Sequence, residues 1–260
     1  MKLSSLLLIK IMKKFLKNII HKIFPEYRDL QVRLSAIENA FATLSLRPEY
    51  ESSVNLSFNS QNYRREIVKS LLGEFKFDAI IETGTFLGDT TGWLLENSKL
   101  PVYSCEISPA YFFTAKKRLS KFYNVHLELG DSRNFLSNLS KTDLKEKTCF
   151  FYLDAHWLSD LPVTEEIKII DDAWLDYVIM IDDFRVLGDD GYGYDDYGPG
   201  KRIDIKLIKP ILNERSISAF FPSLPSQRES GAKRGCVVLT KTGRNSDQMK
   251  KLAEVLVKVE

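Results

Sequence analysis

Acidic side chains recur in this sequence directly after short apolar runs. A histidine accompanies one of them. The residues are Glu82, Glu106, Asp131, Asp154 with His156, and Asp182 with Asp183. Carboxylates that are brought together can bind a cationic ligand, coordinate a metal ion or accept a proton. The first question is therefore whether the fold gathers these residues at one place.

The elements that carry these residues alternate between strand-like and helical patterns. The expected strands are residues 79–82, 102–106, 126–129, 149–154, 177–181, 217–221 and 236–240. The expected helices are residues 65–72, 90–96, 109–122, 132–139, 163–173 and 203–208, the last ending near Pro210. Strands that alternate with helices are joined by right-handed crossovers and build a mainly parallel sheet. We therefore expect an α/β fold with a Rossmann-like, doubly wound, mostly parallel sheet of seven strands.

The last two expected strands follow one another without a clear helix between them. This favours an antiparallel hairpin at an edge of the sheet. Ligands of open parallel sheets bind beyond the carboxyl ends of the strands, which is where the acidic residues stand. The sequence therefore predicts one crevice lined by carboxylates.

The turn after the first strand carries Gly84, Thr85 and Gly88 and leads into a helical pattern. The two glycines let the backbone approach a ligand closely at the start of that helix. Glu106, followed by Ile107 at the end of the second strand, can accept hydrogen bonds from two ribose hydroxyls. Both a nicotinamide dinucleotide and S-adenosylmethionine use such features.

Two residues distinguish these two cofactors. The dinucleotide fingerprint needs a middle glycine for its pyrophosphate, and Phe86 stands at that position here. Glu82 would repel a pyrophosphate, but it suits a ligand with a cationic amino group and a sulfonium. Asp131 offers an acceptor to an adenine amino group, with Ser132 beside it; alternatively, Asp131 caps the helix that begins near Ser132. The combination favours S-adenosylmethionine.

Several segments resemble motifs of the class I S-adenosylmethionine-dependent methyltransferases. They are "ETGTFLGDTT", "VYSCEIS", "LELGDSRNFL" and "FFYLDAHW". With the later "IDDF", the chain looks closest to the small-molecule O-methyltransferases, including the macrocin-type sugar methyltransferases. The resemblance covers residues 63 to 241, and Phe86 departs from it. It implies methyl transfer to a hydroxyl group of a small acceptor, a sugar or a glycosylated metabolite.

Methyl transfer to a hydroxyl group needs an in-line geometry and the removal of a proton. A general base or a metal ion can assist that removal. The resemblance implies that Asp154, Asp182 and Asp183 hold Mg²⁺, with His156 as the base or the group that orients the acceptor. A version without metal keeps Asp154 or His156 as the catalytic base. Both versions remain open at this point.

Residues 185–201, "RVLGDDGYGYDDYGPGK", follow the acidic pair almost directly. The segment is rich in glycine, aspartate and tyrosine, which suits a flexible loop that stacks on a ring or binds a sugar. We expect a substrate lid, with Tyr192, Tyr194 and Tyr197 as contacts. The alternative is an ordinary surface loop.

The N-terminal part of the chain differs in character from the rest. Residues 1–48 are expected to form a basic, amphipathic helical arm, 49–62 a linker, and 63–260 the methyltransferase domain. The arm has no uncharged run long enough to span a membrane, and its order of residues is wrong for a signal peptide. It suits peripheral contact with an anionic membrane or self-association.

The bulk composition sets the remaining expectations. The net charge of +2 indicates no general affinity for nucleic acid. Cys105, Cys149 and Cys236 lie in apolar runs and are expected to be buried, reduced thiols, as in a reducing compartment. We therefore expect a cytoplasmic protein, or one peripheral at the inner membrane surface. Two alternative functions are an NAD-dependent oxidoreductase or epimerase and a non-catalytic, membrane-tethered module on the same fold.

Overall fold

The computed structural model describes residues 33–34, 56–156 and 160–259. The chain divides into two compact units, Met1–Glu51 and Ser52–Glu260. The predicted arm lies almost wholly outside the described residues, so its roles in membrane contact or self-association stay predictions. Within the described part of the chain, no helix has both the length and the apolar character needed to cross a bilayer.

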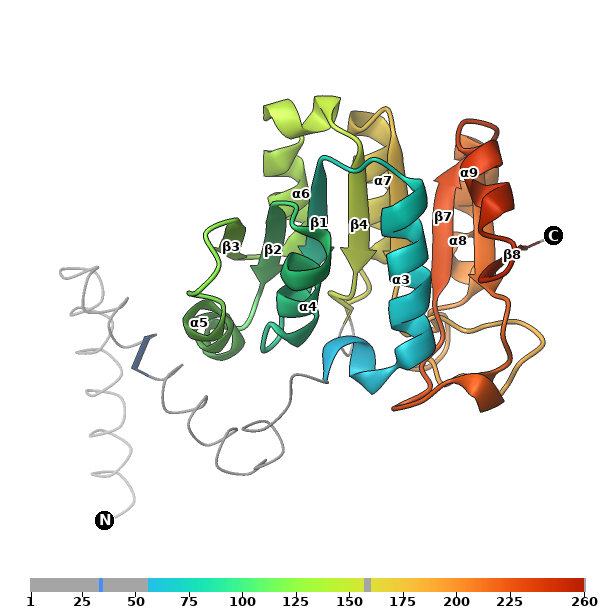
Figure 1. The fold of residues 1–260 in the computed structure, drawn as a ribbon, viewed down its shortest axis with the longest axis horizontal. Coiled ribbons are helices and arrows are strands. Elements are labelled where there is room, and N and C mark those ends of the chain that lie inside the picture. Colours follow the sequence, from blue (N-terminus) through green and yellow to red (C-terminus); the bar gives the residue numbers. More distant parts are fainter. Residues whose placement is uncertain (1–32, 35–55, 157–159, 260) are drawn as a thin grey trace, which may run out of the picture. The chain divides into compact units, whose positions relative to one another are not determined.

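The unit Ser52–Glu260 is built around an eight-stranded sheet with the order β3-β2-β1-β4-β5-β7-β6-β8 (Figure 1). The strands are β1 Ala79–Thr83, β2 Val102–Glu106, β3 Val125–Leu129, β4 Cys149–Leu153, β5 Tyr177–Ile181, β6 Ile217–Pro222, β7 Val237–Lys241 and β8 Leu256–Lys258. Strands β1 to β5 pair in parallel, whereas β7 is antiparallel to both β5 and β6. The predicted α/β class, the mainly parallel sheet and the antiparallel hairpin are confirmed.

The predicted number of seven strands was wrong. An eighth strand, β8, pairs antiparallel with β6, so the β6–β7 hairpin is not the outermost element of the sheet. This strand has three residues, and only Leu256 is buried. A segment this short and this exposed carries no alternating apolar pattern from which a strand can be predicted.

Helices cover both faces of the sheet. They are α3 Asn62–Glu74, α4 Asp89–Ser98, α5 Pro109–Arg118, α6 Ser132–Leu139, α7 Val163–Ala173, α8 Ile205–Arg215 and α9 Ser246–Lys251, with short 3-10 turns η2 Ser57–Ser60, η3 Asp143–Glu146 and η4 Ser226–Arg228. Alternate residues of the central strands face opposite layers. Ile80 and Phe150 pack with α3 and α4, and Ile81 and Phe151 pack with α6 and α7.

Helix α8 corrects the prediction that the helix ends near Pro210. It begins with Asp204 as its N-cap and continues through Pro210 to Arg215. Proline removes one backbone donor inside a helix, which costs about 3 kcal/mol. Ile208, Ile211 and Leu212 are buried on both sides of the proline, and their packing keeps the helix intact.

The register of the central strands aligns the carboxyl ends that matter for function. Thr83 pairs with Leu153, and Leu153 pairs with Ile181, so the residues that follow β1, β4 and β5 emerge at one edge of the sheet. The three cysteines are free and buried, as predicted.

Candidate functional site

Glu82 is a buried carboxylate near the end of β1, with 1% of its surface exposed. Its Oε2 accepts hydrogen bonds from the hydroxyls of Ser104, at 2.6 Å, and Thr91. Its Oε1 is buried and has no hydrogen-bond partner among the described residues. Burial raises the pKa of Glu82 to about 7. One buried acceptor is therefore left unsatisfied, which costs about 1–3 kcal/mol unless a ligand supplies a donor.

The turn after β1 needs its two glycines for the conformation and packing of the backbone. Gly84 has φ +87°, and a Cβ there would lie 2.3 Å from the carbonyl oxygen of Asp154. Gly88 also has positive φ and is the N-cap of α4. At Gly84 the chain's own backbone after β4 makes a close approach, and the approach of a ligand to this turn stays a prediction. The hydroxyl of Thr85 is buried and lies 2.6 Å from that of Ser104.

Phe86 adopts φ 49° at the position where the dinucleotide fingerprint has its middle glycine. Its ring is partly exposed and lies edge-on to Tyr111, with 4.5 Å between the ring centroids. Its N–H donates to Glu106 Oε2 at 2.8 Å. Phe86 thus adopts the left-handed conformation although it is not a glycine, and its hydrogen bond to Glu106 joins the turn to the end of β2.

Glu106 is buried at the end of β2, and the exposed Ile107 follows it. The second carboxylate oxygen, Oε1, accepts the N–H of Ser108 at 2.8 Å. Burial raises the pKa of Glu106 above its ordinary value. Each oxygen of a carboxylate has a further lone pair, so Glu106 retains the capacity to accept two ribose hydroxyls.

Asp131 is the N-cap of α6. It accepts the N–H of Arg133 at 2.9 Å and pairs with the Arg133 guanidinium at 2.6 Å. Those hydrogen bonds hold the pKa of Asp131 below its ordinary value. Asp131 therefore caps the helix, which was the alternative role expected for it, and its contact with an adenine stays a prediction. Ser132 is buried beside it.

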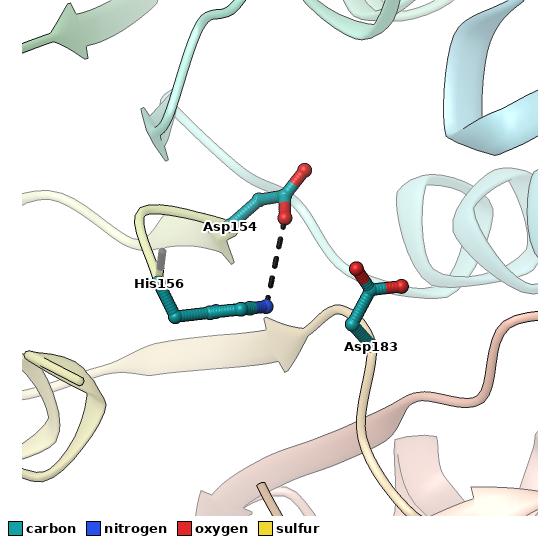
Figure 2. Close-up of side chains that lie close together, drawn as sticks. All are labelled: Asp154, His156 and Asp183. Atoms are coloured by element: carbon teal, nitrogen blue, oxygen red, sulfur yellow. Dashed lines mark ion pairs between the residues drawn. The ribbon is translucent and has the colours of Figure 1, made fainter. Parts of the chain in front are cut away.

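Three residues beyond β4 and β5 could hold a metal ion. Asp154, His156 and Asp183 each offer a ligand atom, and these atoms lie within 4.8 Å of one another (Figure 2). His156 Nε2 lies 3.7 Å from Asp154 Oδ1, which is too long for a hydrogen bond. This nitrogen is buried and has no hydrogen-bond partner among the described residues.

Burial sets the protonation of this group. It lowers the pKa of His156, which favours the neutral imidazole that a metal ion or a proton requires. Burial and the neighbouring carboxylates raise the pKa of Asp154. Burial and Asp182 raise the pKa of Asp183 to about 7. Carboxylates that lie close together raise one another's pKa in this way, and a bound cation would reverse the effect.

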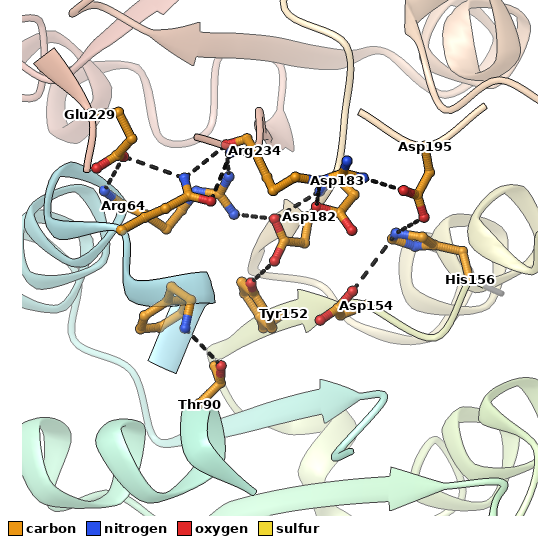
Figure 3. Close-up of polar contacts among 12 residues, drawn as sticks. Arg64, Thr90, Tyr152, Asp154, His156, Asp182, Asp183, Asp195, Glu229 and Arg234 are labelled. Atoms are coloured by element: carbon orange, nitrogen blue, oxygen red, sulfur yellow. Dashed lines mark hydrogen bonds and ion pairs between the residues drawn. The ribbon is translucent and has the colours of Figure 1, made fainter. Parts of the chain in front are cut away.

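Asp182 lies outside this group of converging ligand atoms, and its predicted role as a metal ligand stays a prediction. Asp182 and Arg64 form an ion pair in which each side chain is 1% exposed, and the Tyr152 hydroxyl donates to the same carboxylate (Figure 3). Burial opposes its ionisation, but Arg64 holds the pKa of Asp182 below its ordinary value. The carboxylate is therefore already neutralised by protein.

Of the three tyrosines expected to contact substrate, one lies at the site. Tyr192 is buried, and its hydroxyl donates to the Leu224 carbonyl at 3.0 Å, so it belongs to the core. Tyr194 lies against the guanidinium groups of Arg185 and Arg202. Only Tyr197 reaches the group around His156, where its hydroxyl donates to Asp195 and lies 3.5 Å from the His156 carbonyl oxygen.

Two residues of this site were missed in the sequence. Asp195, in the segment 185–201, places Oδ2 at 3.8 Å from His156 Nε2. Arg234 donates to Asp183 Oδ1 at 2.6 Å and also pairs with Asp195 (Figure 3). Neither stands at the end of a predicted strand, so strand position offered no signal for them.

Comparisons with known proteins address the fold. No protein-family model and no curated protein matches the sequence. The structure is similar to the O-methyltransferase TomG from Streptomyces achromogenes, involved in tomaymycin synthesis and solved in complex with S-adenosylmethionine, with a TM-score of 0.52 and 18% identity over 80% of this chain and 90% of that one. It is also similar to an O-methyltransferase from Bacillus cereus in complex with S-adenosylhomocysteine, with a TM-score of 0.50 and 16% identity over 80% of this chain and 91% of that one. The chain has the fold of the S-adenosylmethionine-dependent methyltransferases.

Proposed function

We propose that this chain is an S-adenosylmethionine-dependent O-methyltransferase that acts on a small hydroxylated acceptor, a sugar or a glycosylated metabolite of the macrocin type. The observation that carries the proposal is Glu82, a buried carboxylate with an unsatisfied oxygen beside the turn that follows β1. A cationic amino group would satisfy that oxygen, whereas a pyrophosphate would be repelled. This favours S-adenosylmethionine over the NAD-dependent alternative.

The cofactor would supply an electrophilic methyl group on its sulfonium. Glu82 would bind the amino group, and Glu106 the ribose hydroxyls, because both carboxylates are buried and face limited competition from water. Ile107, with 68% of its surface exposed, would cover the adenine ring. Asp131 and Ser132 would bound that ring at the start of α6, with the hydrogen-bond capacity that the cap and Arg133 leave to Asp131.

The acceptor hydroxyl must lose its proton as the methyl group transfers. A divalent cation held by Asp154, His156 and Asp183 would lower the pKa of that hydroxyl. The buried His156 Nε2, which has no hydrogen-bond partner among the described residues, and the carboxylate oxygens of Asp154 and Asp183 fit such an ion. Without an ion, neutral His156 can accept the proton directly, since burial lowers its pKa. Tyr197 lies where it can contact the acceptor.

The proposal is tested by methyl transfer from labelled S-adenosylmethionine to a panel of hydroxylated sugars and glycosides, with a divalent cation and with a chelator. We expect label in an ether product of at least one acceptor. Calorimetry with NAD provides the second arm, in which we expect no binding. Binding of NAD without binding of S-adenosylmethionine would overturn the proposal.

A further inference from the structure

Three consecutive residues of η2 are left-handed although none of them is a glycine. Phe58, Asn59 and Ser60 have φ angles of 52°, 56° and 61°. A side chain makes this conformation unfavourable, and it persists only where the surrounding structure holds it. The Phe58 ring is buried and lies edge-on to those of Trp93 and Tyr152, with 5.1 and 5.3 Å between the ring centroids. The turn is therefore fixed against the domain.

Residues 229–235, the stretch before β7, pack against the middle of this turn. The Ala232 N–H donates to the Asn59 carbonyl oxygen at 3.1 Å. Gly231 has φ +60°, and a Cβ there would lie 2.3 Å from the same oxygen. The backbone of the turn and the backbone of residues 229–235 are therefore in direct contact, with no room for a side chain between them.

Gln61, which directly follows the turn, connects it to Arg234. The Gln61 side chain is fully buried. Its Nε2 donates to the Arg234 carbonyl oxygen at 2.8 Å, and its Oε1 accepts the Arg234 N–H at 2.9 Å. Both polar groups of the Arg234 backbone are thus satisfied by one side chain, as a neighbouring strand would satisfy them. The position of Arg234 therefore depends on a residue that is 173 positions away in the sequence.

The Arg234 side chain extends from there to the group around His156 (Figure 3). Its guanidinium donates to Asp183 Oδ1 at 2.6 Å and also pairs with Asp195. Asp183 follows the end of β5, whereas Asp195 belongs to segment 185–201. Arg234 therefore joins this segment to the carboxyl end of the sheet.

Segment 185–201 also pairs with the same stretch through its backbone. The Gly193 N–H donates to the Lys233 carbonyl oxygen at 2.8 Å, and the Gly235 N–H donates to the Gly193 carbonyl oxygen at 2.7 Å. The segment is thus held by residues 233–235 through both side chains and backbone.

We propose that Gln61 is a positioning residue of the candidate site. By holding the backbone of Arg234, it keeps the guanidinium on the two aspartates and couples the left-handed turn to segment 185–201. This inference rests on the proposed function and adds to it a residue that touches none of the reacting groups.

The competing interpretation is that segment 185–201 is held by its own contacts. The Asp195 N–H donates to the Asp183 carbonyl oxygen at 2.9 Å, and the Tyr197 hydroxyl donates to the Asp195 carboxylate. In that case Gln61 serves only the fold, and the order of the segment does not depend on it.

Hydrogen exchange of the full chain, followed by mass spectrometry without cofactor or acceptor, separates the two interpretations. Gln61→Met keeps the length of the side chain but removes both hydrogen bonds to Arg234. We expect the amides of residues 193–197 to exchange at least about tenfold faster than in the wild type, because two supporting hydrogen bonds are lost. The amides of β1 should keep their rates.

Gln227→Met is the matched control. Gln227 is an exposed residue of η4, and we expect unchanged exchange throughout segment 185–201. Unchanged exchange of residues 193–197 in Gln61→Met, or acceleration by the same factor throughout the chain, would overturn the inference.

A second variant tests the route through Arg234. Arg234→Met removes the guanidinium from Asp183 and Asp195, so residues 193–197 should exchange faster in this variant as well. Because Gln61 acts through Arg234, adding Gln61→Met to Arg234→Met should accelerate exchange by less than about twofold more. Additive effects of the two substitutions would overturn the inference.

The unmodified protein provides a test that needs no variant to fold. Gly193 and Gly235 donate across the same contact, so their amides should open together. We expect their exchange rates, corrected for the intrinsic rates of the free amides, to agree within about fivefold. A larger difference would show that the segment moves independently and would overturn the inference. S-adenosylmethionine binding, measured separately, decides the proposed function independently of these results.

Discussion

Asp182 and Asp183 are neighbours in the sequence, but they serve different partners. Asp182 directly follows β5 and forms a buried ion pair with Arg64. Asp183 has φ 51°, a left-handed conformation, and its carboxylate lies with Asp154 and His156 and accepts a hydrogen bond from Arg234. The left-handed residue bends the chain directly after β5. One carboxylate therefore stabilises the fold, and the next is available to a ligand.

The buried ion pair predicts a large effect on stability. Arg64→Ala would leave the Asp182 carboxylate buried and without its counter-ion, so we expect the free energy of unfolding to fall by about 3–5 kcal/mol. Arg244→Ala is the control. Arg244 pairs with Asp176 at 3.9 Å with 41% of its side chain exposed, and we expect a loss of at most about 1 kcal/mol. Urea unfolding measures the free energy of unfolding of both variants. Equal losses in the two variants would contradict the role of Arg64 as the counter-ion of Asp182.

The close approach at Gly84 makes a second prediction. Gly84→Ala places a Cβ against the Asp154 carbonyl and forces alanine into positive φ, so we expect a loss of at least about 2 kcal/mol. Gly73→Ala, in α3, meets no atom within 4 Å and should gain about 0.5–1 kcal/mol. Thermal and urea unfolding of the two variants provide the comparison. An unchanged free energy of unfolding in Gly84→Ala would contradict the close contact between Gly84 and the Asp154 carbonyl.

Glu82 predicts a specific dependence of stability on pH. Burial raises its pKa from 4.5 to about 7, so the folded state holds the proton more tightly than the unfolded chain does. Its contribution is therefore present below pH 4.5 and is lost as the pH rises to about 7; the loss is at most roughly 3 kcal/mol. Glu82→Gln should remove this loss, and the difference between wild type and variant across pH 4 to 8 isolates it from other groups. A difference that is constant with pH would contradict the assignment.

Segment 185–201 predicts opposite outcomes for two tyrosines. Tyr197→Phe removes a hydroxyl that lies beside His156, so we expect the KM for the acceptor to rise while the Kd for S-adenosylmethionine stays the same. Tyr192→Phe removes a hydroxyl that bonds to the Leu224 carbonyl in the core. We expect it to lower stability by about 1 kcal/mol and to leave the KM unchanged. Steady-state kinetics and unfolding experiments on both variants test these two roles. A higher KM in Tyr192→Phe but not in Tyr197→Phe would contradict them.

Most of the sheet could be predicted because its strands are buried on both faces and therefore read as continuous apolar runs. Phe150 and Phe151, for example, face opposite helical layers, so neither face needed polar residues. The strand β8 could not be found in this way because Val257 and Lys258 are exposed. The helix was predicted to end near Pro210 because proline has a low helix propensity. The packing of Ile211 and Leu212, which stabilises the helix beyond Pro210, cannot be inferred from local propensity.

The sequence predicts those residues of the candidate site that stand at the ends of strands. Asp154 and Asp183 come together because β4 and β5 are neighbours in register, which alternation of elements implies. The separation of Asp182 from Asp183 depends on Arg64, which is far away in the sequence. Asp195 and Arg234 enter from loops whose course no local pattern specifies.

The central claim is that carboxylates at the ends of β1 and β2 bind a cationic nucleoside. Calorimetry of S-adenosylmethionine binding to Glu82→Gln and Glu106→Ala tests it most directly, with Glu128→Gln, an exposed acid on β3, as the control. We predict that each site variant weakens binding by about 1.5–3 kcal/mol, as loss of a charge-assisted hydrogen-bonding group does, and that the control binds like wild type. An unchanged Kd for both Glu82→Gln and Glu106→Ala would contradict the account.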